Sequence, residues 1–432
     1  MQQMKTLCIL ISLALCLFIK NASAQLADRI FDESIHSAKL YKAGDQTSFP
    51  ALMLNSNDLL ELHFDDLDGD IKNYYYSFQL CNADWSPGML RTFEYTKGFQ
   101  NVRITNYRSS SIAFTKYTHY QATVPDRNAY PTRSGNYLLK VFLNGDTSKL
   151  AFTKRFVVID NKSSIAAQIL QPFNARLFRS AHKLQIAVQT DSRIQLFSPT
   201  DLKVVALQNN NWQTSLVMDR PTIYRGNYYE YSDESITAMP AGKEFRWIDL
   251  RSFRLKSDRM HELQAKGNTT HVVVRPDAPR SEQAYVYYRD LNGSFTTETL
   301  ESVNPLWQGD YAYVHFSYFP PGNSRLEGQE VHIFGELTNY AADTLGRMKF
   351  NTERGAYEKT LLLKQGYYNY TYVTLPTKRQ KALPDFSATE GNYWGTENSY
   401  VVLVYYRPFG ARADELIGYT SLNSIFQGQG IR

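Results

Sequence analysis

The sequence predicts an all-β protein built of tandem immunoglobulin-like or E-set β-sandwich domains. Tyrosine and phenylalanine are abundant, with 31 Tyr and 24 Phe among 432 residues, and both favour the half-buried surface of a strand. Short apolar runs with alternating polarity are separated by turn-forming residues, which is the spacing typical of a sandwich. Long amphipathic helical periods are scarce, so a helical fold is not indicated.

Residues 1–24 are predicted to be a signal peptide. Lys5 precedes the apolar run 7–19, and Ala22-Ser23-Ala24 matches an A-x-A cleavage site. The residue directly after this site is Gln25 and not a cysteine, so a lipoprotein anchor is not indicated. No later apolar run reaches the ~18 residues of a membrane-spanning helix. We therefore expect an exported chain that begins at Gln25, without direct insertion into a membrane.

Composition excludes two further classes. Cys81 is the single cysteine after the predicted signal, so the exported chain can form no internal disulfide and must depend on apolar cores. Loss of Lys5 and Lys20 lowers the 47 basic residues by two, which leaves a net charge of about +3 against 42 acidic residues. That balance argues against a nucleic-acid-binding protein.

The first predicted domain covers residues 25–160. In its second strand Tyr74, Tyr76, Phe78 and Leu80 share one face, which defines the inward side. The strands expected here are 59–64, 73–80, 118–124, 135–143 and 152–159.

A middle β-rich domain is predicted for 161–276 and a C-terminal sandwich for 277–410, followed by a tail at 411–432 that is expected to be partly disordered. The middle domain is expected to contain strands at 184–189 and 271–275 and a strand-like segment at 242–255. The C-terminal sandwich is expected to contain strands at 284–288, 311–318, 331–335, 357–363, 366–373 and 400–406.

The stretch from Ser399 to Tyr406 has β-branched and aromatic residues on both faces, so it predicts a strand buried between two layers. Arg407-Pro408 ends it, because proline has no N–H for a ladder and holds the preceding residue extended. Phe409-Gly410 then turns the chain away.

Four carboxylates in one loop raise the question of a calcium site. Asp65, Asp66, Asp68 and Asp70 could offer oxygen ligands, but Ile71 stands where an EF-hand has glycine and no glutamate closes the loop. The pattern favours a solvated hairpin turn, and we predict no metal and no other cofactor.

Catalytic chemistry is not indicated. The eight histidines are scattered without metal-ligand spacing. Cys81 lies on a predicted strand with no local base, where a lone cysteine is usually a small apolar filler. We therefore predict that the protein is not an enzyme.

Four residues are candidates for partner binding. Trp85 lies in the polar turn 82–87, where its ring could either cover the core edge or anchor a partner. Trp394, Arg407 and Phe409 are further anchor-type residues beside turns, and tryptophan and arginine dominate interface energetics.

The stretch 331–373 is similar in layout to the starch-binding sandwiches of glycan-processing enzymes. Tyr340 falls where those families usually carry a tryptophan, and a second aromatic platform is not evident, so a shared scaffold is favoured over a shared ligand. A periplasmic or cell-surface carbohydrate-binding protein remains the alternative function.

Longer motifs resemble the plug-protein family of the type IX secretion system. They follow one another in the family's order across nearly the whole exported chain, and Leu80 stands where the family is expected to have histidine. The motifs are FDDLDGDIKNYYYSF, CNADW, YTHY, SGNYLLKV, LQPFNARLFRS and ENSYVVLVYYRPFGARADELIGY.

This resemblance implies a periplasmic protein, peripheral to the inner leaflet of the outer membrane. It would bind the periplasmic mouth of the large outer-membrane translocon barrel (SprA) as a monomer within the complex, and seal the pore when no substrate is in transit. A plug requires a broad rigid surface, which sandwich cores can provide.

Overall fold

The computed structural model describes residues 28–378 and 382–425. Strands make up 48% and helices 5% of the protein, and several of the sheets are antiparallel, which confirms the mostly β prediction. The predicted signal peptide, 1–24, and the last part of the predicted tail, 426–432, lie outside the described residues. Within the described residues, none of the helices has the length and apolar composition needed to cross a bilayer.

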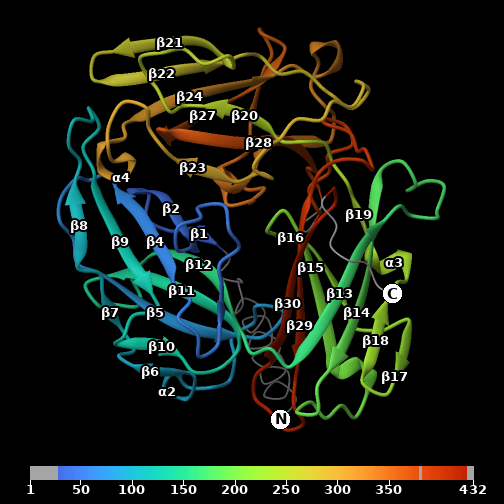
Figure 1. Ribbon diagram of the computed structural model, residues 1–432. Helices are drawn as coiled ribbons and strands as arrows, with labels where there is room; N and C mark the ends of the chain where they lie inside the picture. The colour runs from blue at the N-terminus through green and yellow to red at the C-terminus, as the bar shows by residue number, and fades with distance from the viewer. Residues whose placement is uncertain (1–27, 379–381, 426–432) are drawn as a thin grey trace, which may run out of the picture.

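Three units of packed sheets make up the fold, and Figure 1 shows the first at the left, the second at the right and the third across the top. The first unit, 28–160, has one sheet in the order β1-β12-β11-β5-β7 with β3 parallel to β12, and a second in the order β2-β4-β9-β8. A small pair, β10-β6, follows helix α2. The elements are β1 (Arg29–Ile30), β2 (Ile35–Lys42), β3 (Ala51–Met53), β4 (Leu60–Asp66), β5 (Tyr74–Cys81), α2 (Thr92–Tyr95), β6 (Thr96–Gly98), β7 (Val102–Arg103), β8 (Asn106–Ser109), β9 (Thr118–Val124), β10 (Ala129–Pro131), β11 (Gly135–Leu143) and β12 (Leu150–Ile159).

Aromatic side chains fill the core between the two sheets of this unit. Tyr74 and Tyr76 point inward from β5, as the period-2 pattern predicted, while the alternate positions of the strand are half-buried. Phe64 from the opposite sheet stacks on Tyr120 with ring centroids 5.1 Å apart. Burial of such rings supplies a large apolar contribution per residue, so this unit needs no disulfide.

The second unit combines residues 163–240 with 399–423. Its sheets have the orders β13-β14-β18-β17, with β19 on β14, and β16-β15-β29-β30. The elements are β13 (Ser163–Leu170), β14 (Ala181–Thr190), η2 (Pro199–Asp201), β15 (Leu202–Gln208), β16 (Asn211–Met218), β17 (Ile223–Arg225), β18 (Tyr228–Tyr231), α3 (Glu234–Thr237), β19 (Ala238–Pro240), β29 (Ser399–Tyr406) and β30 (Glu415–Asn423).

The third unit, 246–376, pairs β20, β23 and β25 around the long strand β28, opposite a sheet in the order β21-β22-β24-β27-β26. The elements are β20 (Arg246–Asp249), β21 (Met260–Lys266), β22 (Thr269–Val274), β23 (Phe295–Thr297), α4 (Pro305–Gln308), β24 (Tyr311–Tyr318), η3 (Pro321–Asn323), β25 (Gln329–Phe334), η4 (Glu336–Thr338), β26 (Lys349–Asn351), β27 (Ala356–Lys364) and β28 (Gly366–Pro376).

The structure corrects the predicted division of the C-terminal half. Strand β29 was placed in the C-terminal sandwich, but it pairs with β15 of the second unit, and the predicted tail supplies β30, its other neighbour. Conversely β20, β21 and β22, which were placed in the middle domain, belong to the sheets of the third unit. Strand pairing over such separations leaves no local signal in the sequence.

The predicted strand 284–288 is absent from the described structure. This segment is held by side chains instead of a ladder, because the hydroxyls of Tyr285 and Tyr288 donate to the carboxylate and the backbone carbonyl of Glu244. The aromatic residues of 284–288 therefore anchor a linker and do not form a strand.

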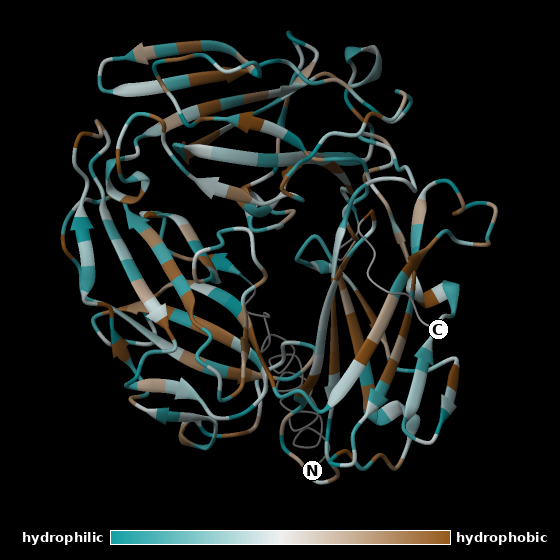
Figure 2. Cartoon of the chain, in the orientation of Figure 1, coloured by the Kyte–Doolittle hydropathy of each residue, from teal (hydrophilic) through white to brown (hydrophobic). Residues whose placement is uncertain are grey.

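Strand β29 is buried on both faces, which confirms the prediction from its composition. Val402 and Val404 point into the core of the second unit, while Leu403 and Tyr405 pack against Val157 and other residues of the first unit. Figure 2 shows brown, apolar segments along these central strands. The outer face of this sheet thus packs against the first unit.

Candidate functional site

Trp85 is an internal packing residue. Its backbone has φ 64°, and the residue is 8% exposed. The ring meets Trp212 of the second unit edge to face at 4.8 Å, and the guanidinium of Arg155 lies 5.2 Å from the ring centroid. The ring is therefore unavailable to an outside partner in this conformation, and the interpretation of a turn whose tryptophan covers the core describes the observed packing.

Arg407 and Phe409 lie together on an exposed loop that follows β29. Phe409 is 90% exposed, and its ring meets that of Phe197, 78% exposed, edge to face at 5.7 Å. Arg407 donates through Nε to Asp414 at 2.7 Å and through a terminal nitrogen to Asn82 at 2.8 Å. Phe197 was missed in the sequence because it precedes β15 by a few residues in a loop more than two hundred residues before Phe409.

A surface hollow of about 350 Å³ opens beside these two rings. The exposed Lys203 lines it, as do Tyr405 and Tyr406 at the end of β29. Tyr406 donates its hydroxyl to the carbonyl of Gln195 at 2.7 Å, which fixes the two loops relative to each other. The sequence pattern gave no indication of this hollow, since its walls come from two distant loops.

Trp394 lies elsewhere. The residue is 40% exposed. Its backbone N–H donates to the backbone carbonyl of Arg179 at 3.0 Å, and its backbone carbonyl bonds the ring of His182. Trp394 precedes β29 and Phe409 follows it, so the two lie at opposite ends of an eight-residue strand, which spans roughly 25 Å. The structure thus brings Arg407 and Phe409 together on one loop and ties that loop to the turn of Trp85, whose ring is buried. Trp394 lies away from them.

The aspartate loop contains its own cation. Nζ of Lys72 lies 2.9 Å from a carboxylate oxygen of Asp66 and 3.7 Å from one of Asp70, and it also bonds Asp68. These three carboxylates are close enough together to hold a metal ion. The ammonium group of Lys72 lies among them and offsets part of their negative charge.

Asp65, the fourth carboxylate, points the other way because alternate residues of a strand face opposite sides. It is fully buried and accepts bonds from Lys364 Nζ at 2.5 Å, Tyr311 Oη at 2.6 Å and the ring of His119 at 2.6 Å. Lys364 and Tyr311 belong to the third unit, so this cluster joins the first unit to the third. Burial alone would raise the pKa of Asp65, but Lys364 and His119 hold it below its usual range.

Further bonds close the same seam between the first and third units. Asp310 accepts from the backbone N–H groups of Phe114 and Thr115 at 2.9 and 3.0 Å. Lys39, itself buried, pairs with Glu336 at 2.9 Å. Bonds to buried charged groups are stronger than neutral ones, so the two units are fixed in one orientation.

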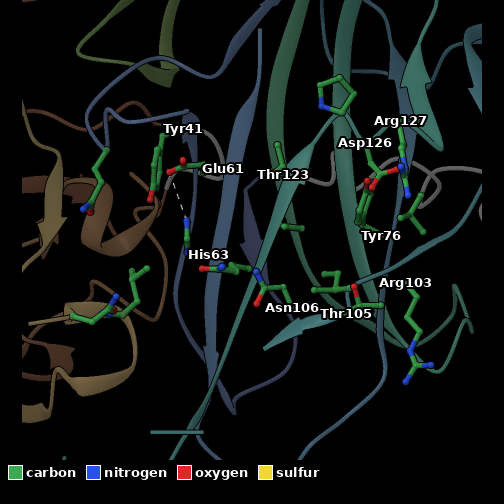
Figure 3. Close-up of a pocket in the computed structure, with 18 of the residues that line it drawn as sticks. Tyr41, Glu61, His63, Tyr76, Arg103, Thr105, Asn106, Thr123, Asp126 and Arg127 are labelled. Atoms are coloured by element: carbon green, nitrogen blue, oxygen red, sulfur yellow. Dashed lines mark hydrogen bonds and ion pairs between the residues drawn. The ribbon is translucent and has the colours of Figure 1, made fainter. Parts of the chain in front are cut away.

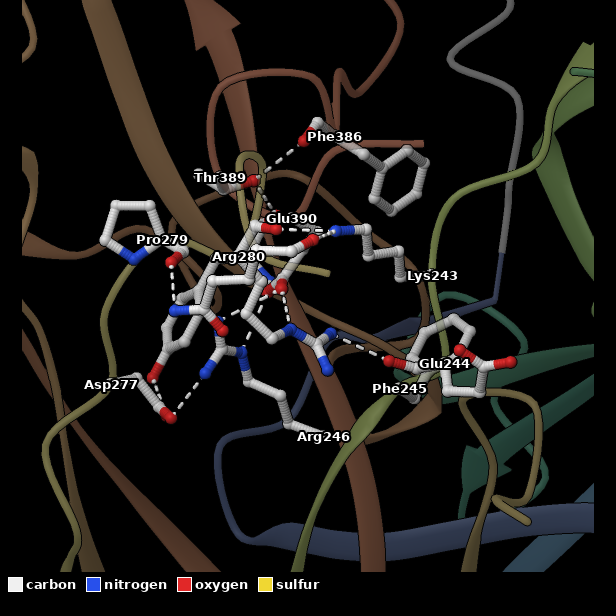
Figure 4. Close-up of polar contacts among 12 residues, drawn as sticks. Lys243, Glu244, Phe245, Arg246, Asp277, Pro279, Arg280, Phe386, Thr389 and Glu390 are labelled. Atoms are coloured by element: carbon white, nitrogen blue, oxygen red, sulfur yellow. Dashed lines mark hydrogen bonds and ion pairs between the residues drawn. The ribbon is translucent and has the colours of Figure 1, made fainter. Parts of the chain in front are cut away.

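A second buried network organises the linkers around the third unit (Figure 4). Arg246 binds Glu390 through two nitrogens at 2.9 and 3.1 Å and Asp277 through a third at 2.6 Å. Arg280 adds a bond to Glu390 at 2.6 Å. Although burial opposes ionisation, Arg246 and Arg280 lower the pKa of Glu390 to about 2. These groups satisfy one another, so the network is a structural clamp.

Three carboxyl groups gather where the second and third units meet. Asp290 accepts from the N–H of Phe245 and Asn292, and the amide of Asn292 donates to Glu397 at 3.0 Å. Burial, aided by the nearby charges of Glu397 and Glu244 and opposed by the backbone bonds, raises the pKa of Asp290 to about 7. This junction therefore changes charge near neutral pH.

A hollow of about 720 Å³ lies between the first unit and α4 of the third (Figure 3). Glu61 and His63 stand on one side, and Tyr76, Asp126 and Arg127 on the other. Burial, together with the charge of His119, lowers the pKa of His63 to about 3, so this ring is neutral at physiological pH. The aromatic residue Tyr76 is 1% exposed and offers no platform for a sugar ring.

Cys81 is buried at the contact between the first and second units. Its thiol donates to the carbonyl of Gln79 at 3.7 Å, and burial raises the pKa of the thiol to about 12. A protonated, inaccessible thiol is a poor nucleophile, so the residue packs as a small apolar group.

These features define a class: a β protein of three units whose seams are closed by buried charges, with an exposed aromatic and cationic loop at one end. The comparisons with known proteins add a family match over the first unit. Residues 35–160 match the family model described as "Type 9 secretion system plug protein 1st domain", so the family resemblance is confirmed over this segment. The match covers the first unit from β2 to the end of β12.

One solved structure matches nearly the whole chain. It is a crystal structure of a hypothetical protein from Parabacteroides merdae, with a TM-score of 0.89 and 28% sequence identity over 93% of this chain and 100% of that chain. A biofilm-associated protein BSP domain matches with a TM-score of 0.17 and 8% identity, too low to support an argument. No curated protein sequence matches the chain.

Proposed function

We propose that this protein is a periplasmic plug of the type 9 secretion system, which binds the periplasmic mouth of the outer-membrane translocon (SprA) and seals its pore between transport events. The observation that carries this proposal is the match of residues 35–160 to the first domain of the plug proteins. A non-enzymatic role accords with that match, since the family is one of secretion-system plug proteins.

The rigidity of the molecule supports the proposal. A cap on a wide pore must resist deformation, and the buried contacts of Asp65 with Lys364 and of Arg246 with Glu390 hold units and linkers together. A stable complex would bury about 1,600 Å² in total. Within it we place Arg407 and Phe409, with Trp394 as a separate contact. The immunoglobulin-like or E-set assignment of the units stays a prediction.

Carbohydrate binding is less well supported. Tyr340, at the position where starch-binding sandwiches usually carry a tryptophan, is 9% exposed, and its ring packs on Phe334 with centroids 5.7 Å apart. A sugar stacks on an accessible ring face, which this residue does not offer.

The test compares the outer-membrane permeability of four strains: wild type, a deletion of this protein, a deletion of the translocon, and the double deletion. If the protein closes the pore, the single deletion admits a large hydrophilic antibiotic and the double deletion restores exclusion. An impermeable single deletion, together with binding of the protein to immobilised polysaccharide, would replace the plug with the carbohydrate-binding alternative.

A further inference from the structure

Strand β4 presents Glu61 and His63 to the hollow between the first unit and α4 (Figure 3). Alternate residues of a strand share one face, so the two side chains lie next to each other. The hollow, of about 720 Å³, opens to solvent, since Arg103, Asn106 and Thr123 on its lining are exposed. The side chain of Glu61 is 37% exposed and that of His63 is 12% exposed. A solute that enters the hollow can therefore contact both polar groups.

A hydrogen-bonded chain behind His63 fixes the positions of its ring protons. Nδ1 of His119 lies 2.6 Å from the carboxylate of Asp65, which only accepts, so this nitrogen carries a hydrogen. Burial lowers the pKa of His119 against the opposing effect of Asp65, so the ring is neutral and its Nε2 is an acceptor. Nδ1 of His63 lies 3.1 Å from that Nε2 and must donate to it. The neutral ring of His63 is left with an unprotonated Nε2 on the side of Glu61.

Glu61 and His63 thus offer two acceptors to the same ligand. Oε2 of Glu61 lies 3.7 Å from Nε2 of His63, beyond hydrogen-bond distance, and neither atom carries a hydrogen at neutral pH. Within the part of the chain that the structure describes, no lysine or arginine forms an ion pair with Glu61. A cation that donates to both atoms would satisfy the carboxylate and the imidazole together.

The ring of Tyr41 favours a planar cation. It stacks on His63 with centroids 5.6 Å apart and an angle of 10° between the ring planes, and it also lines the hollow. Burial and the carboxylate of Glu61 raise the pKa of Tyr41, so its neutral hydroxyl leaves the charge of Glu61 uncompensated. A donor approaches Nε2 in the plane of the imidazole, so a guanidinium bound there would lie parallel to the tyrosine ring. Guanidinium groups stack on aromatic faces in this way.

The net charge of the hollow does not select the ligand. Its charged lining residues balance one another, since two acids, Glu61 and Asp126, accompany two cations, Arg103 and Arg127. Figure 3 shows Asp126 and Arg127 across the hollow from Glu61 and His63. Recognition must therefore depend on direct bonds to the two acceptors on one wall.

We propose that Glu61 and His63, with the ring of Tyr41, bind a guanidinium group, as carried by an arginine of a partner polypeptide or by free arginine. This inference goes beyond the proposed function and does not depend on it. His119 and Asp65 are positioning residues, because they hold His63 in the tautomer that accepts at Nε2. Asp65 also binds Lys364 of the third unit, so the site lies at one end of a chain that reaches the seam between the two units.

The experiment is calorimetric titration of the full-length purified protein with the peptide acetyl-Gly-Gly-Arg-Gly-Gly-amide. We expect saturable binding with one site per chain. The same peptide with citrulline in place of arginine keeps the shape without the charge, and it should bind at least about tenfold more weakly. Titration with free arginine distinguishes the two sources, since a polypeptide site should prefer the peptide and a small-molecule site should not.

Three variants locate the site. Glu61→Gln removes the charged acceptor and should weaken binding of the arginine peptide at least about tenfold. His63→Phe keeps a ring beside Tyr41 without Nε2 and should weaken binding in the same direction, with urea unfolding used to confirm that the variant is folded. Asp126→Asn, on the opposite wall, is the matched control and should stay within about twofold of wild type because its charge is screened.

The outcomes decide the proposal. Binding that is lost with citrulline and with Glu61→Gln, but retained in Asp126→Asn, supports the site. The absence of saturable binding by wild-type protein overturns it. Equal binding of the citrulline peptide also overturns it, because the ligand then does not bind through its charge. An equal loss in Glu61→Gln and Asp126→Asn would show a general effect of charge and would likewise refute a local pair of acceptors.

Discussion

Removal of the Asp65 carboxylate charge should destabilise the protein severely, although the residue lies in a sequence that looks like a simple turn. Asp65→Asn leaves the ammonium group of Lys364 buried without its counter-ion and weakens the bonds from His119 and Tyr311. Breaking one side of a buried pair typically costs about 3–5 kcal/mol of unfolding free energy.

The structure gives a second estimate of this cost. Burial lowers the pKa of Lys364, and Asp65 opposes that shift. Without Asp65 the lysine can lose its proton, and neutralising an ordinary lysine at pH 7.5 costs about 4 kcal/mol, roughly three pKa units at 1.36 kcal/mol each. This limit agrees with the range for broken buried pairs, so we expect a loss near 4 kcal/mol.

Urea unfolding followed by tryptophan fluorescence measures the change. The double variant Asp65→Asn with Lys364→Met should recover most of the loss, since replacing both charges is often close to neutral. Asp68→Asn is the control, because the side chain of Asp68 is 60% exposed and pairs with Lys72 in solvent, where such pairs contribute about 0–1 kcal/mol. A loss below about 1 kcal/mol for Asp65→Asn, or no recovery in the double variant, would refute the reasoning.

Three further changes test other features. Asp290 has a pKa raised to about 7, so the folded state binds its proton more tightly than the unfolded state does. The free energy of unfolding should therefore fall by up to a few kcal/mol as pH rises from ~4 to ~7. Urea midpoints measured across that range should lose this pH dependence in Asp290→Asn, and an unchanged pH dependence would contradict the assignment. Trp85→Ala should lower unfolding free energy by about 3–5 kcal/mol, because the ring fills the contact with Trp212; a surface role would give under 1 kcal/mol. EDTA should leave the melting temperature unchanged because the ammonium group of Lys72 already lies among the carboxylates of the aspartate loop, and a drop of several degrees that calcium reverses would show a metal site instead.

Local patterns predicted many individual strands well. The alternation of large apolar residues placed strands at Gly135–Leu143 and Tyr311–Tyr318 with the bounds that the structure has. The apolar residues on both faces of Ser399–Tyr406 correctly predicted that this strand is buried between two layers. These features depend on neighbours within a few residues, because a strand's pleat repeats every two positions.

The grouping of strands into units and the composition of the surfaces depended on the tertiary structure. Strand β29 pairs with β15, almost two hundred residues earlier, and Asp65 meets Lys364 from 299 residues away. The sequence marked Trp85 and Phe409 alike as rings beside turns, but the first is covered by Trp212 and the second is open to solvent. Burial is decided by whichever distant segment packs against a residue, and that contact leaves no trace in the local pattern of the chain.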